Sequence, residues 1–209
     1  MNKIKFFLGS LAVVAMMATV ACNKDEGTDP QPEPEVKDGA VVVNELMTKD
    51  SLGLVYTDTL GKECDWSEFY NPGEKDINIG GYFIADDGED SKEEDKYEIP
   101  NNAAAATTIK AKSYLVVVWG AKYIDNNKDT LDLEGVHNNI IFCGSSLSSK
   151  KDKAVAIWDA NGKFIDESEY FNADGPFGKL EEGKSIGRKS DGDSEWIIFD
   201  VPTPGAKNQ

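Results

Sequence analysis

Short segments rich in β-branched and aromatic residues follow one another from residue 40 to the end of the chain. Glycine, asparagine, aspartate and proline separate them, and no segment carries a sustained helical stripe of apolar residues between caps. The first expected strands lie at 40–46, 65–71, 77–86, 97–100, 107–111 and 113–120. Many short strands joined by polar turns predict an all-β fold, either a sandwich or a barrel.

Two of the expected strand regions have a more specific signature. "SYLVVVWG" at 113–120 is nearly continuous in apolar residues, which suits a central strand covered on both faces. "DANGK" at 159–163 predicts a β-hairpin, with Asn161 and Gly162 in the positive-φ positions of a type I′ turn. Roughly 170 residues follow residue 40, which is enough for one domain with its own core.

The first 21 residues have the form of a secretory signal peptide. Lys3 and Lys5 precede an apolar run over 6–18, and small residues lead to Cys22. That run is shorter than the ~20 apolar residues of a membrane-spanning helix. The small residue before Cys22 resembles a bacterial lipoprotein box, although Thr19 stands where leucine is usual. The resemblance implies that Cys22 becomes the lipid-bearing N-terminus, with palmitate among its acyl chains. The alternative is an ordinary secreted protein.

Residues 22–39 have the composition of a disordered tether. After Cys22 they read "NKDEGTDPQPEPEVKDG", which is polar, acidic and proline-rich. The start at 23–26 resembles the short acidic signals that route some Gram-negative lipoproteins to the outer face of the outer membrane. Retention on the periplasmic side is the alternative. The predicted organisation is therefore a signal peptide (1–21), a tether (22–39) and a folded domain (40–209).

The chain is strongly acidic. Without the signal peptide, 20 basic residues face 38 acidic ones, a formal charge of about −18. Phosphate binding needs a basic face, so nucleic acid is excluded as a partner. The remaining expected partners are the membrane, through the lipid, and an unidentified protein or glycan.

Cys64 and Cys143 are left as a pair once Cys22 is assigned to the lipid. In an oxidising compartment such a pair predicts a disulfide. Two separately buried thiols are the alternative, and the choice depends on a Cα separation that sequence does not supply.

Several quoted pieces, taken in order, resemble the lamin-tail domain. They are "VVVNEL", "DWSEFYNPG", "INIGGYFIAD", "SLSSKKDKAVAIWDANGKFIDESEY", "SIGRK" and "VPTPGAKN", and together they span nearly all of 40–208. The resemblance implies an immunoglobulin-like β-sandwich. It also implies that the Asn71–Gly73 turn, Gly80-Gly81 and the closing Pro202–Gly205 determine the fold. No residue is catalytic in that family, and the domain has no established activity of its own.

The stretch "DWSEFYNPG" has two interpretations. Asp65 and Glu68 could be an acid/base pair of a hydrolase, or the stretch could be one strand entering a turn. Residues three apart on a strand point to opposite faces, so the strand interpretation separates the two carboxylates. It puts Trp66, Glu68 and Tyr70 on one face, where Glu68 is expected to be a hydrogen-bonded structural carboxylate.

No cofactor is predicted, and metal binding is limited to weak calcium binding by acidic loops. The loops at 86–96 and 122–135 are rich in oxygen ligands. The second resembles an EF-hand, but Thr130 replaces the required glycine and Val136 the final glutamate. "GKLEEGKS" at 178–185 matches a phosphate loop in letters only, because a turn precedes it and a strand follows.

Three Asp-Ser/Thr-Leu triplets resemble an O-glycosylation pattern of some anaerobic Gram-negative bacteria. The acceptors would be Ser51, Thr59 and Thr130.

Three hypotheses for function remain. The first is a non-catalytic, lipid-anchored binding or scaffolding module at the cell surface. The second is a carbohydrate-binding lipoprotein that uses exposed aromatics among the tyrosines and Trp66, Trp119, Trp158 and Trp196. The third is the hydrolase described above.

Overall fold

The computed structural model describes residues 40–57, 61–120, 131–132 and 139–209. These residues belong to one compact unit, Pro34–Gln209. Several predictions fall outside the described residues: the signal peptide, the tether with Cys22, Thr59, Thr130 and most of the loop at 122–135.

Strands make up nearly all of the regular structure. In chain order they are β1 (Val42–Met47), β2 (Asp65–Tyr70), β3 (Ile77–Asn78), β4 (Phe83–Ala85), β5 (Tyr97–Glu98), β6 (Thr108–Ile109), β7 (Tyr114–Trp119), β8 (Leu131–Asp132), β9 (Ile140–Cys143), β10 (Ala156–Trp158), β11 (Phe164–Glu167), β12 (Ser185–Arg188) and β13 (Trp196–Phe199). Within the described ranges, helix is limited to the 3₁₀ turn η1 (Glu93–Asp95) and the single turn α1 (Ala104–Thr107). Neither is long and apolar enough to cross a membrane.

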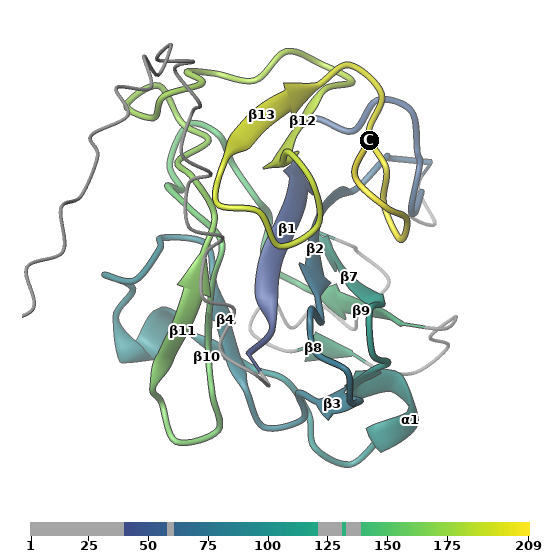
Figure 1. The fold of residues 1–209 in the computed structure, drawn as a ribbon. Coiled ribbons are helices and arrows are strands. Elements are labelled where there is room, and N and C mark those ends of the chain that lie inside the picture. The colour runs from purple at the N-terminus through teal and green to yellow at the C-terminus, as the bar shows by residue number, and fades with distance from the viewer. Residues whose placement is uncertain (1–39, 58–60, 121–130, 133–138) are drawn as a thin grey trace, which may run out of the picture. The chain divides into compact units, whose positions relative to one another are not determined.

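The strands form two main sheets and a small pair (Figure 1). The larger sheet has the order β13-β12-β1-β2-β7-β9-β8, and the smaller has the order β11-β10-β4-β5. Neighbouring strands are antiparallel except β7 and β9, which are parallel. Strands β3 and β6 pair separately. The all-β sandwich of the immunoglobulin-like type that the sequence predicts is confirmed.

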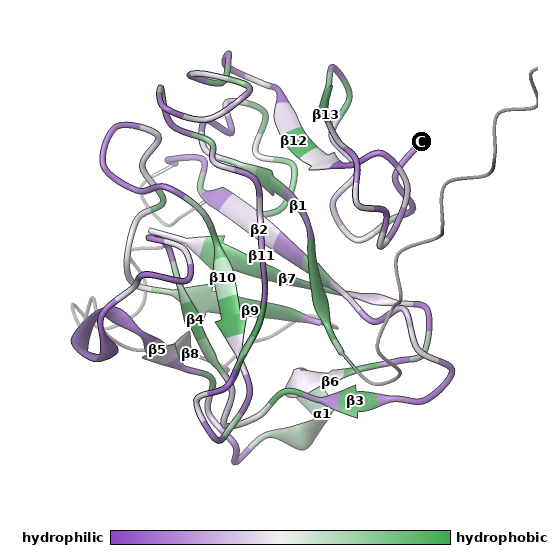
Figure 2. Ribbon diagram, turned by 60° about the vertical axis from the view of Figure 1, so that its left-hand side comes forward, coloured by the Kyte–Doolittle hydropathy of each residue, from purple (hydrophilic) through white to green (hydrophobic). Residues whose placement is uncertain are grey.

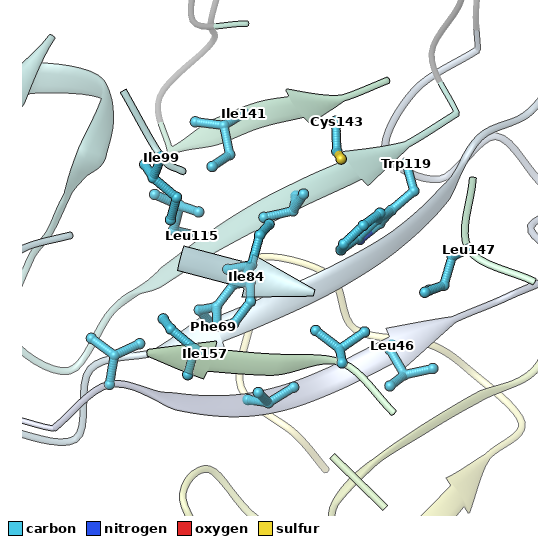
Figure 3. Close-up of a cluster of buried hydrophobic side chains, with 14 of the residues drawn as sticks. Leu46, Phe69, Ile84, Ile99, Leu115, Trp119, Ile141, Cys143, Leu147 and Ile157 are labelled. Atoms are coloured by element: carbon cyan, nitrogen blue, oxygen red, sulfur yellow. The ribbon is translucent and has the colours of Figure 1, made fainter. Parts of the chain in front are cut away.

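The hydrophobic core lies between the two main sheets. Phe69, Leu115 and Trp119 of the larger sheet meet Ile84 and Ile157 of the smaller one in a single buried cluster (Figure 3). Strands β4, β7, β9 and β10 are accordingly hydrophobic along most of their length (Figure 2). We call the face of the larger sheet that meets this core its inner face, and the opposite face its outer face.

Strand β7 occupies the central position that its apolar run predicts. It lies between β2 and β9, and its residues from Leu115 to Trp119 are all buried. Leu115, Val117 and Trp119 belong to the core cluster, whereas Val116 and Val118 pack in separate clusters on the outer face. A strand covered on both sides needs apolar residues at every position, which accounts for the absence of alternation.

Two local predictions differ from the structure. The segment 77–86 forms two strands in different sheets, because Gly81 turns the chain between them with φ +82°. The neighbouring Gly80 packs tightly, since a Cβ on it would lie 3.0 Å from the Cα of Asn101. The hairpin at 159–163 is present, but its turn is not type I′. Within 159–163 only Gly162 has positive φ. Its N–H donates to the backbone carbonyl of Asp159, and the N–H of Lys163 donates to the Asp159 carboxylate, as in a wider hairpin loop with one left-handed residue.

Candidate functional site

Two buried glutamates lie opposite each other on the outer face of the larger sheet. Glu45 of β1 is the register partner of Glu68 of β2, and neither side chain is exposed. A β-bulge between Val43 and Glu45 displaces the register of β1 at this point. Buried carboxylates require hydrogen-bond donors, and most of those found here come from distant parts of the chain.

The C-terminal segment 200–208, which we call the closing segment, supplies several of these donors. Thr203 donates to Glu45 through its backbone N–H, at 3.1 and 3.2 Å to the two oxygens, and through its hydroxyl at 2.8 Å. Gly205 donates its N–H to Glu68 Oε2 at 2.6 Å. Ser185 of β12 adds a hydroxyl bond of 2.5 Å to Glu45. The closing segment is thereby fixed over β1 and β2.

Asparagine side chains and Asp191 complete this arrangement. Asn44 Nδ2 donates to Glu68 Oε1 at 2.9 Å and to Asp191 Oδ1 at 3.1 Å. Asn208 Nδ2 donates to the carbonyl of Arg188 at 2.6 Å, and its N–H donates to Asp191 at 3.1 Å. We call the set Asn44, Glu45, Glu68, Asp191 and Asn208 the outer network. Its members are buried or half-buried.

Burial dominates the electrostatics of the outer network. It raises the pKa of Glu68 well above its usual range, although the bonds from Asn44 and Gly205 oppose the shift. Burial likewise raises the pKa of Glu45, and the nearby charge of Asp191 adds to that rise. The donors to both carboxylates described above are hydroxyls, amides and backbone N–H groups, which carry no charge. The arrangement is therefore suited to holding a segment in place.

A second buried polar group joins the two sheets. Arg188 of β12 forms an ion pair with Asp166 of β11 at 2.8 Å, and its Nε donates to the carbonyl of Val43 at 2.7 Å. The same Asp166 oxygen accepts the N–H of Val43 at 2.8 Å. Trp196 stacks against the guanidinium, whose central carbon lies 5.1 Å from the ring centroid. This contact is structural and lies at the margin of the sandwich.

Asp65 and Glu68 do not form a catalytic pair. Glu68 lies on the outer face of the larger sheet. Asp65 shares its face with Ser67 and Phe69, which is the inner face. Asp65 accepts the N–H of Asp50 at 3.2 Å, and burial raises its pKa to about 6. The predicted division of this strand between two faces is confirmed, as is the structural environment of Glu68.

The tryptophans do not form an exposed platform. Trp66, Trp119 and Trp158 are at most 3% exposed. Lys96 Nζ lies 4.5 Å from the ring centroid of Trp158 and helps to cover it. The half-buried Trp196 packs against the core, and the guanidinium of Arg188 covers its ring. The aromatic arrangement that would favour carbohydrate binding is not made by these four residues.

Cys64 and Cys143 are both buried but belong to different clusters. Cys143 packs in the core, on the inner face (Figure 3). Cys64 packs with Val118 and Phe142 on the outer face. The sheet thus lies between the two clusters, which does not favour a disulfide, and the bridge stays a prediction. Ser51 is exposed, so its hydroxyl is accessible, and its glycosylation also stays a prediction.

The acidic loop at 86–96 lies beside the smaller sheet. Burial raises the pKa of Asp86 to about 7, and the charge of Asp152 contributes further. Among the described residues, no group of three or more histidine, cysteine or acidic side chains could hold a metal ion. Weak calcium binding by this loop stays a prediction. In the segment 178–185 strand β12 begins at Ser185, the last residue of the glycine-lysine-serine sequence, so a strand stands where a phosphate loop has its helix.

Sequence reasoning missed most of the outer network and the Arg188 contact. The segment "VVVNELM" places Asn44 and Glu45 inside a strand whose other residues are apolar. This polar pair is the one feature of the sequence that indicates a buried polar group in this strand. Their partners could not be inferred, because Ser185 and Thr203 are 140 and 158 positions away from Glu45. The closing segment, which the resemblance marks as a determinant of the fold, lies over the outer face of β1 and β2.

Comparison with known families gives one match. A family model described as the lamin tail domain matches residues 35–172. The match includes β1 to β11, with both glutamates, whereas β12, β13 and the closing segment follow it. No curated protein matches the chain.

Proposed function

Because the chain belongs to the lamin tail domain family, we propose that it is a non-catalytic binding or scaffolding module, held at the cell surface by a lipid on Cys22. The family is immunoglobulin-like and generally non-catalytic. A sandwich of this kind presents loops and strand edges to a partner and holds them on a rigid core.

One observation carries the non-catalytic part of the proposal. The two glutamates that the fold brings together, Glu45 and Glu68, use three of their four oxygens on the closing segment or on Ser185, and the fourth on Asn44. A general acid or base must reach a substrate proton. These carboxylates are fully buried under the closing segment, so their arrangement supports the fold and offers nothing to a substrate.

The anchored location rests on the sequence. A charged start, an apolar run and a small residue before Cys22 support lipid attachment. The polar, proline-rich residues 23–39 would place the sandwich beyond the lipid headgroups. The acidic residues that follow Cys22 resemble a surface-export signal, which supports display on the outer face of the outer membrane.

Both parts are tested on intact cells that carry the full chain. Metabolic labelling with an alkyne fatty acid should mark the chain and fail to mark Cys22→Ser, and external protease should digest the anchored chain. Surface cross-linking should then capture a protein partner. An unlabelled chain would overturn the anchor, and protection from protease would place the sandwich inside the periplasm.

Enzymatic activity is tested separately. Purified full chain is incubated with surface polysaccharides and peptides, alongside a Glu68→Gln variant whose folding is verified by circular dichroism. No turnover is expected from either protein. Hydrolysis by the native chain that disappears in folded Glu68→Gln would overturn the non-catalytic proposal.

A further inference from the structure

A hollow of about 230 Å³ opens on the outer face where two coverings of the larger sheet meet. One covering is the loop after β1, represented by Leu54 and Val55, and the other is the closing segment, represented by Pro204 and Gly205. The floor comes from the sheet itself.

The walls of the hollow are held in place by the hydrogen bonds of residues behind them. The Asp50 carboxylate accepts the backbone N–H groups of Leu52, Gly53 and Leu54 at 2.8, 2.8 and 3.0 Å, which fixes the loop. The bond from Gly205 to Glu68 fixes the closing segment on the other side. The hollow is thus preformed, and a ligand that enters it has little ordering cost to overcome.

The lining is apolar at the floor and polar at two points. Val116 and Ile140 pack in a cluster with Val55, and the hydroxyl of Tyr114 is held by Asp191 at 2.7 Å. Ser113 and Asn139 also line the hollow, and no hydrogen bond joins either side chain to another described residue. The hollow thus combines apolar walls with polar groups that a ligand could reach, as binding sites commonly do.

Two further features single out this place. Asn139 has φ +65°, a left-handed conformation that asparagine adopts more readily than most non-glycine residues. Trp66 packs with the lining residues Val55, Val116 and Ile140, and its buried Nε1 has no hydrogen-bond partner among the described residues. An unsatisfied buried donor thus packs against residues that line the hollow.

The size of the hollow restricts the ligand. Pockets that enclose a drug-sized ligand are about 300–1,000 Å³. A hollow of about 230 Å³ is smaller and fits one bulky side chain rather than a sugar chain. Leu54, which is 43% exposed, extends the apolar surface at the rim. Partner side chains inserted in small apolar pockets commonly dominate binding at protein interfaces.

We propose that this hollow receives one leucine or phenylalanine side chain from an extended segment of a partner protein. Ser113 and Asn139 then hydrogen-bond the peptide groups beside that side chain. Asp191 contacts the lining residue Tyr114, and the whole chain carries a net charge of −16. The partner segment therefore has lysine or arginine near its apolar residue. This inference rests on the proposed function as a binding module.

The test uses the full chain in phospholipid nanodiscs, because detergent would compete for an apolar hollow. The probes are N-acetyl-leucinamide and N-acetyl-phenylalaninamide, with N-acetyl-alaninamide as the small control. Methyl NMR of leucine, valine and isoleucine follows the titration. Saturable shifts at Leu54, Val55, Val116 and Ile140 are expected with the two larger probes, and at least fivefold weaker binding is expected with the alanine compound.

Matched variants identify the residues that act. Leu54→Asp places a charge on the rim and should weaken binding at least fivefold, whereas Leu52→Asp, on the same loop, 60% exposed and outside the lining, should leave it unchanged. Asn139→Gly keeps the positive φ and removes the amide, so a loss of about fivefold is expected from one hydrogen bond. The unchanged methyl spectrum of each variant verifies its fold.

Three outcomes would overturn the inference: no saturable shift at these methyls, equal binding of the alanine probe, or equal effects of Leu54→Asp and Leu52→Asp. The proposed function is judged by a different readout. If cross-linking on cells still captures a partner with Leu54→Asp, the module binds through another surface. In that case the hollow is excluded while the proposed function stands.

Discussion

Gly205 donates its backbone N–H to the buried carboxylate of Glu68 at 2.6 Å, although 137 positions of sequence separate the two residues. Together with the bonds from Thr203 to Glu45, this contact turns the last residues of the chain into a covering of the larger sheet. The motif at 201–208 is therefore part of the fold, and its removal would uncover buried carboxylates.

Replacing Glu68 by alanine should destabilise the protein strongly. The Asn44 amide and the Gly205 N–H would lose their acceptor, and a cavity would form, so we expect a loss of about 3 kcal/mol in the free energy of unfolding. Urea denaturation measures the loss, and hydrogen exchange should accelerate at Thr203 and Gly205. Glu195→Ala is the control, because its exposed pair with Lys189 is worth about 0–1 kcal/mol. Equal losses in the two variants would contradict the assigned role.

Stability should fall as pH rises from about 4 to about 7. Burial raises the pKa of Glu45 and of Glu68, that of Asp65 to about 6 and that of Asp86 to about 7. The folded state thus binds more protons than the unfolded state between the ordinary carboxyl pKa and these raised values, so the free energy of unfolding decreases across that window. Denaturation at a series of pH values tests this sign.

The Glu68→Gln variant measures how much of this pH dependence of stability comes from Glu68. Glutamine resembles the protonated carboxyl, so the variant should lose less stability than the native chain between pH 4 and pH 7. An unchanged slope would show that Glu68 does not take part, and a stability that rises with pH would contradict the raised pKa values as a group.

Two buried tryptophans offer a matched comparison. Trp119 Nε1 donates to Ser67 at 2.9 Å, whereas Trp66 Nε1 has no partner among the described residues. Both rings are at most 1% exposed, so substitution by phenylalanine removes similar packing. Trp119→Phe should cost about 1 kcal/mol more than Trp66→Phe, because it also leaves the Ser67 hydroxyl unsatisfied. Thermal and urea denaturation provide the comparison, and a larger loss for Trp66→Phe would contradict it.

Local patterns predicted the parts of this fold that depend on neighbouring residues. The alternation in "DWSEFY" gave Trp66 and Glu68 the correct common face, and the apolar run of β7 gave its central position. Gly80-Gly81 does lie at a close approach of the backbone to Asn101, but the sequence did not predict that 77–86 divides there into two strands. Each of these features is encoded within a few residues.

The candidate site could not be predicted in the same way. The partners of Glu45 and the ion pair of Arg188 depend on strand order, which no short segment specifies. The hollow is formed by the loop after β1, β7, the start of β9 and the closing segment, so its existence depends on how these four segments pack. The lipid, the glycosylation and the disulfide stay predictions from sequence.

Arg188 and Asp166 should be strongly coupled in stability. The pair joins β12 of the larger sheet to β11 of the smaller one, with side chains 9% and 22% exposed. Asp166→Ala leaves a nearly buried guanidinium without its carboxylate, and we expect a loss of about 3–5 kcal/mol. Arg188→Lys should also destabilise, because an ammonium cannot reach the Val43 carbonyl, the Asp193 carbonyl and Asp166 in the geometry of the guanidinium.

A double-mutant cycle separates this coupling from general loss of packing. Combining Arg188→Met with Asp166→Leu removes both charges, so the double variant should lose less stability than the sum of the two single losses. Lys189→Met, which alters the adjacent exposed pair with Glu195, should change the free energy of unfolding by less than about 1 kcal/mol. Additive losses in the cycle would show that the contact does not join the two sheets energetically.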